Sequence, residues 1–91
     1  MWFTYVLYNK VINKFYIGAT NNIKRRLEEH ASKSVTTTSK SGDWGCVYFE
    51  GCLSKKDAFR REKELKTGYG RGYLRKRVTN YLDSLNNIQP K

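Results

Sequence analysis

The sequence has 91 residues, enough for one small domain with little core to spare. It carries 18 Lys and Arg against 8 Asp and Glu, a formal net charge of +10. Ten of the basic residues lie between Lys55 and Arg77, so the positive charge is clustered. Clustering favours a polyanionic partner, either nucleic acid or an anionic membrane surface, over a merely soluble basic surface.

Export, membrane insertion and zinc binding have no support in the sequence. The apolar stretches are strand-sized, well short of the roughly 20 residues that a spanning helix needs. The N-terminus lacks the basic start and apolar core of a signal peptide. Cys46 and Cys52 have no Cys or His partners at metal-ligand spacing. We therefore expect a cytoplasmic protein without membrane contact, with both cysteines reduced and packed.

The chain begins with a predicted hairpin followed by a helix. Residues 4–9 are rich in aromatic and β-branched side chains and predict a strand. The turn is expected over 10–13 and the partner strand over 14–18. A helix is predicted over 22–31, capped by Thr20 or Asn21, because its apolar residues recur every four positions.

The second half predicts a strand and two helices. Residues 32–43 are polar and predict a loop, and 44–51 predict a third strand. A helix capped by Ser54 is expected to run to Lys66 and to stop at the glycines that follow. A last helix is predicted over 73–85.

These elements predict one α+β domain, a three-stranded antiparallel sheet flanked by about three helices. We expect the domain to span residues 1–85 and the tail, 86–91, to fray.

Glu62 is the most informative position on the predicted second helix. It lies in the middle of a stripe that includes Ala58, Phe59 and Leu65. A carboxylate in a packing stripe is costly unless its charge is compensated. The stripe alone leaves two interpretations open: an ion pair with an arginine, or a metal ligand at the floor of a cleft whose basic residues hold phosphate.

Other candidate residues are ordinary when taken singly. Arg26 and His30 are four residues apart and project from one face of the first helix, as many surface pairs do. Tyr5, Tyr8 and Tyr16 on the hairpin are core residues or cross-strand partners by default, although a hydroxyl at the edge of a basic cleft can also orient or activate a water. The glycine-rich segment after Gly68 lacks the Lys-Ser/Thr ending of a Walker loop, and we expect a basic turn that approaches a phosphate.

Together these positions resemble the GIY-YIG nuclease family over nearly the whole chain. The second signature of the family is present as Tyr-Ile-Gly at 16–18, and Tyr5 stands where the first motif has its tyrosine. The first tripeptide here is Phe-Thr-Tyr and keeps only that tyrosine. The arginine and histidine of the family fall on Arg26 and His30, and its metal-binding glutamate falls on Glu62.

The resemblance implies a DNA endonuclease that uses one Mg²⁺ or Mn²⁺ ion to hydrolyse phosphodiester bonds, with DNA repair and recombination as candidate pathways. It implies Glu62 as the metal ligand and Arg26 as a forked donor to the phosphate. Tyr5 is the candidate general base or water-orienting group, which requires positive charge nearby to lower a pKa of ~10. Tyr16 would lie beside the attacking water, and His30 would orient Tyr5 or carry its proton.

Substrate choice is less readable. The basic residues expected to contact DNA are Lys24, Arg25, Lys40, Arg61, Lys66 and Arg71. Asn80 is the candidate for the late asparagine of the family. The chain has no room for an appended targeting domain, so we expect a monomer that prefers branched or damaged DNA, or that relies on a targeting partner. The alternatives are a non-catalytic nucleic-acid-binding module with the same fold and a basic structural protein.

Overall fold

The computed structural model of the chain describes residues 1–32 and 44–86. The strands are β1 (Trp2–Asn9), β2 (Lys14–Thr20) and β3 (Trp44–Cys52). The described helices are α1 (Ile23–Ala31), α3 (Lys55–Leu65), α4 (Gly68–Arg77) and α5 (Thr79–Asn86). The strands form one antiparallel sheet in the order β2-β1-β3, so the predicted α+β fold is confirmed, with four described helices instead of about three. Residues 33–43 and 87–91, which hold most of the predicted loop and tail, lie outside the described residues.

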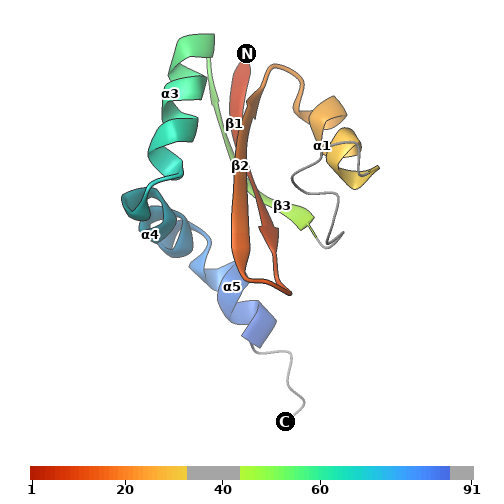
Figure 1. Cartoon of the computed structure of the whole chain (residues 1–91), viewed down its shortest axis with the longest axis vertical. Helices are drawn as coiled ribbons and strands as arrows, with labels where there is room; N and C mark the ends of the chain where they lie inside the picture. The colour runs from red at the N-terminus through yellow and green to blue at the C-terminus, as the bar shows by residue number, and fades with distance from the viewer. Residues whose placement is uncertain (33–43, 87–91) are drawn as a thin grey trace.

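Strand β1 is the centre of the fold and is covered on both faces. Figure 1 shows α3 and α4 on one side of the sheet and α1 on the other. On the α3 side, the buried residues Val6, Ile17, Leu65 and Leu74 form the core cluster. Because one strand serves both layers, six consecutive residues of β1, 4–9, are all buried.

Two polar residues of β1 are buried because each satisfies backbone groups elsewhere. The Thr4 hydroxyl donates to the Ala58 carbonyl of α3 at 2.9 Å, which fixes the helix on the sheet. The Asn9 Oδ1 accepts from the Val11 and Ile12 N–H groups at 2.9 and 3.2 Å, which closes the hairpin turn.

The predicted cap of the first helix is wrong by one or two positions. Asn22, not Thr20 or Asn21, caps α1, because its Oδ1 accepts the Arg25 N–H at 3.1 Å. Thr20 is still in β2, and its hydroxyl oxygen accepts the Asn22 N–H at 3.1 Å.

The single last helix predicted over 73–85 is also wrong. The chain forms α4 and α5, separated at Val78, which has φ −112° and ψ 30°. The glycine-rich segment predicted as a turn is the start of α4, capped by the Thr67 hydroxyl, which accepts the Gly70 N–H at 3.1 Å. A Cβ at Gly70 would overlap the backbone of Leu65, so the glycine allows α4 to start directly against the end of α3.

Two smaller predictions can be compared with the structure. In the described part of the chain, no helix is long and apolar enough to cross a membrane. Both cysteines are free, but Cys46 is exposed and is not a packing residue.

Candidate active site

The register of the hairpin brings two of the predicted tyrosines to one face of the sheet. Tyr5 pairs with Gly18, and Leu7 pairs with Tyr16. Since alternate residues of a strand share a face, Tyr5 and Tyr16 both lie on the side of α1. Their ring centroids are 6.4 Å apart.

Gly18 provides the space that the Tyr5 ring occupies. A Cβ at Gly18 would overlap the Tyr5 hydroxyl oxygen and Cζ and would lie 2.9 Å from Cε1. The ring of Tyr5 therefore passes directly over the backbone of β2. The glycine of the second signature is required for the position of a side chain, not for an unusual backbone conformation.

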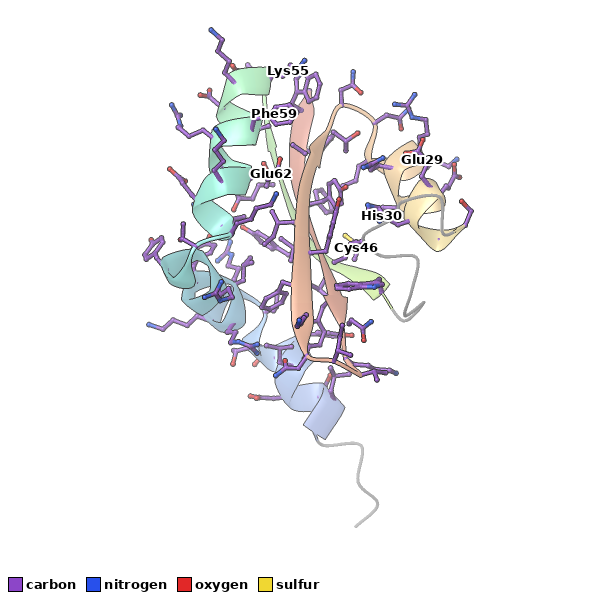
Figure 2. The ribbon with its side chains drawn as sticks, viewed as in Figure 1. Glu29, His30, Cys46, Lys55, Phe59 and Glu62 are labelled. Atoms are coloured by element: carbon purple, nitrogen blue, oxygen red, sulfur yellow. The ribbon has the colours of Figure 1, made fainter. Side chains whose placement is uncertain are left out.

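Helix α1 supplies two groups that converge on the Tyr5 hydroxyl. His30 Nε2 lies 3.0 Å from this oxygen, and either atom is the donor depending on the histidine tautomer. Arg26 Nε donates to the same oxygen at 3.2 Å, while its Nη1 donates to Glu29 Oε1 at 2.9 Å. The ring of Tyr16 lies 5.0 Å from that of His30. Figure 2 shows His30 extending from α1 toward the sheet.

Burial is the main influence on the protonation states of Tyr5 and His30. It raises the pKa of the Tyr5 hydroxyl above its ordinary value of 10.0, and the hydrogen bond from Arg26 only partly offsets this effect. Burial also lowers the pKa of His30 below 6.5, and the neighbouring charge of Arg26 lowers it further. At neutral pH the cluster therefore holds a neutral tyrosine, a neutral histidine and one permanent positive charge.

Glu62 approaches the cluster from the other side of β2. Figure 2 shows Glu62 on α3 and His30 on α1, with β2 between them. The Glu62 side chain is 17% exposed, and its Oε2 lies 2.7 Å from Nζ of Lys66. Its ion pair is thus with a lysine one turn along the same helix, and not with an arginine. The negative charge of Glu62 contributes to the raised pKa of Tyr5, so the two residues are in electrostatic range of each other.

A groove of about 370 Å³ lies between β2 and the residues at the end of α3 and the start of α4. Its lining residues are Phe15, Tyr16, Ile17, Lys66 and Arg71. Arg71 Nη1 donates to the backbone carbonyl of Lys66 at 3.4 Å, so the Arg71 guanidinium lies close to the Lys66 backbone. Aromatic rings beside cations suit a nucleotide, whose base stacks and whose phosphate is anionic.

The other predicted DNA contacts are not part of this groove. Lys24 and Arg25 are exposed on α1. Arg61 is engaged in a forked pair in which Nε and Nη2 donate to the two carboxylate oxygens of Glu50, both at 3.0 Å. Lys40 lies outside the described residues.

Two supporting residues were not anticipated from the sequence. Glu29 bonds Arg26 from three positions further along α1, a spacing that is visible in the sequence. The role of Gly18 depends on its cross-strand partner, which only the register reveals. Asn80, the candidate for the late asparagine of the family, is exposed on α5.

The donor groups fit a magnesium-like ion better than a closed metal site. In the ranges 1–32 and 44–86, no three His, Cys, Asp or Glu side chains are grouped so that they could hold a metal. A site at Glu62 would therefore offer a protein carboxylate and leave most positions to water and phosphate. Mg²⁺ is commonly held in this way, by one or two carboxylates together with substrate phosphates.

Comparison with known proteins assigns the chain to a family. The family model of the GIY-YIG catalytic domain matches residues 1–81. The fold is similar to the solution NMR structure of the UPF0213 protein BH0048 from Bacillus halodurans, with a TM-score of 0.56 and 26% sequence identity, covering 99% of this chain and 100% of that chain. A search of curated proteins found no significant match. The family match covers most of the chain, so this protein belongs to the GIY-YIG family of nuclease domains.

Proposed function

We propose that this protein is a DNA endonuclease that hydrolyses phosphodiester bonds with the help of one Mg²⁺ or Mn²⁺ ion. The observation that carries the proposal is the convergence of Arg26 and His30 on the Tyr5 hydroxyl, together with a groove lined by Tyr16 and by Lys66, the ion-pair partner of Glu62.

Glu62 is the proposed holder of the metal ion. When bound, the ion supplies a Lewis acid that stabilises negative charge on the leaving 3′-oxygen and the phosphate. The carboxylate is mostly buried and on a helix, so it keeps its position before the substrate arrives. Lys66 and Arg71 line the groove beside β2 and would hold neighbouring phosphates.

Arg26 is the proposed donor to the reacting phosphate. Two of its N–H groups bond Tyr5 and Glu29, which fixes the plane of the guanidinium. The remaining N–H groups can donate to a phosphate oxygen in the forked geometry that lysine does not offer.

Tyr5 and His30 are the proposed route for the proton of the attacking water. In the tautomer protonated at Nδ1, neutral His30 accepts the Tyr5 proton at Nε2 while the Tyr5 oxygen takes the proton from the water. Arg26 stabilises the negative charge that develops on the Tyr5 oxygen during this transfer. The relay removes the need for a tyrosine that is already ionised at neutral pH. Tyr16, at the groove, would position the water.

The groove recognises features that all DNA shares. Rings stack on any base and cations bind any phosphate, so neither reads a base sequence. We therefore propose that a monomer selects DNA by its structure, such as a branch or a lesion, or is directed by a partner protein. Either mode suits a role in DNA repair or recombination.

Nicking of supercoiled plasmid tests the proposed function. Wild-type protein should nick with Mg²⁺ or Mn²⁺ and not in EDTA. Glu62→Gln should lower the rate by at least about 100-fold, as expected when a main source of electrostatic stabilisation is removed, and should retain or improve DNA binding. Glu64→Gln is the matched control, because Glu64 lies on the same helix and bonds Arg61.

Two results would contradict this assignment. If Glu62→Gln cleaves at the wild-type rate, the metal is not held at Glu62. If the wild-type protein binds DNA in a salt-sensitive way but never breaks a strand with either ion, the protein is a non-catalytic nucleic-acid-binding module.

A further inference from the structure

We propose that Lys66 occupies the place of the divalent cation on Glu62 in the metal-free protein, and that it leaves for a DNA phosphate when the ion binds. The inference rests on the proposed function, because it assumes that Glu62 holds the ion. It adds a specific role for Lys66 as a positioning residue that couples metal binding to DNA binding.

The ion pair explains how a mostly buried carboxylate persists without a metal. Glu62 is 17% exposed, and the Lys66 ammonium at 2.7 Å compensates its charge. A divalent ion would bind at about 2.1 Å from the same carboxylate. Two cations on one carboxylate repel each other at such short range, so the ammonium must move before the ion can bind.

Lys66 is built to move its side chain while its backbone stays in place. Its N–H donates to the Glu62 carbonyl at 3.2 Å, and its own carbonyl accepts from Arg71 Nη1 at 3.4 Å. The side chain is 53% exposed and ends a flexible four-carbon stem. Because Lys66 also lines the groove, the released ammonium lies where a phosphate would be bound.

The movement of Lys66 from Glu62 to a phosphate makes the binding of the metal ion and the binding of DNA cooperative. Without DNA, the ion must displace an ammonium that exchanges its carboxylate partner for water. With DNA bound, a phosphate accepts the ammonium and the displacement costs less. By reciprocity of binding, the ion strengthens DNA binding by the same factor.

Direct titration with Mn²⁺ in the absence of DNA tests the exchange, with free Mn²⁺ measured by electron paramagnetic resonance. Lys66→Met should bind Mn²⁺ roughly two- to fivefold more tightly than wild type, the factor expected when an ion pair with one exposed partner no longer competes. Lys63→Met is the control, because it removes the same charge from an exposed site in the last turn of α3. The gain should vanish when Lys66→Met is combined with Glu62→Gln.

The results of these titrations distinguish failure of the Lys66 exchange from failure of the proposed metal dependence. The inference is overturned if Lys66→Met binds Mn²⁺ no more tightly than wild type, if Lys63→Met gives an equal gain, or if the gain persists without the Glu62 carboxylate. If plasmid nicking depends on Glu62 and a metal but Lys66→Met shows no gain, only the exchange fails. If neither wild type nor Lys66→Met binds Mn²⁺, both the exchange and the proposed metal dependence fail.

Discussion

Gly18→Ala should disable the site although it removes none of the proposed catalytic side chains. The added Cβ would lie 2.9 Å from Cε1 of Tyr5 and would overlap the hydroxyl end of the ring. Ordinary carbon contacts are about 3.5–4.0 Å, so the ring must move by roughly 1 Å. Tyr5 is 1% exposed and has no solvent to move into. The shift must therefore lengthen its bonds to Arg26 and His30, now 3.2 and 3.0 Å.

The cost can be estimated for stability and for rate. Overpacking a full core by one methyl group costs roughly 1–3 kcal/mol. In a domain of this size, each kcal/mol lowers the Tm by about 4–8 °C. A displacement of about 1 Å in a catalytic group costs on the order of 100-fold in rate. Cleavage should therefore fall even at temperatures where the variant is fully folded.

Urea unfolding followed by circular dichroism, together with plasmid nicking, measures both effects. Gly45→Ala is the matched control, because among the described residues no atom beyond its chain neighbours lies within 4 Å of a Cβ at that strand position. Adding Tyr5→Phe to Gly18→Ala removes one of the two atoms that the Cβ overlaps and leaves Cζ in place, so it should recover only a small part of the stability and none of the cleavage. The reasoning is refuted if Gly18→Ala unfolds within about 0.5 kcal/mol of wild type, the range of neutral surface changes, and cleaves normally.

Three other perturbations have defined outcomes. Gly70→Ala should lower the free energy of unfolding by roughly 1–3 kcal/mol because its Cβ meets the Leu65 backbone. Gly72→Ala should not, because a Cβ there meets no atom of the described residues outside its own helix within 4 Å. Equal urea midpoints for the two variants would contradict this. Because burial and the charge of Arg26 lower the pKa of His30, the unfolded chain binds that proton more tightly. Stability should be complete above the unfolded value of 6.5 and decline as the pH falls through the folded pKa, and His30→Gln should flatten this part of a urea titration. Arg26→Lys keeps the charge but cannot bond both partners in a fork, so single-turnover cleavage should slow by roughly 10- to 100-fold. An unchanged rate would show that charge alone suffices.

The strands were predictable from the sequence because their signals are local. Aromatic and β-branched runs marked all three, and the observed strands are only longer at their ends. The start of α4 was not predictable, because glycine disfavours helices in isolation. Helix formation there depends on the Thr67 cap and on the close approach of Gly70 to Leu65, which is a tertiary contact.

The part of the site that depends on the spacing of residues along a helix was predictable from the sequence. Arg26 and His30 share a helix face in any α1, and both do meet the Tyr5 hydroxyl. The state of that hydroxyl was not predictable, because the balance between burial and a nearby charge depends on packing. The Lys66 partner of Glu62 was within reach of the sequence, since the two residues are one helical turn apart.

The distribution of the site along the chain ties its activity to complete folding. Tyr5, Tyr16, Arg26 and His30 belong to the first 30 or so residues, whereas Glu62 arrives on α3, which is held to β1 by the bond from Thr4 and by the shared core. On the proposed function, a nascent chain would therefore have no nuclease activity until α3 has left the ribosome and docked. A partly unfolded copy that has released α3 would lack the proposed metal-binding carboxylate and, on the proposed function, would not cut DNA.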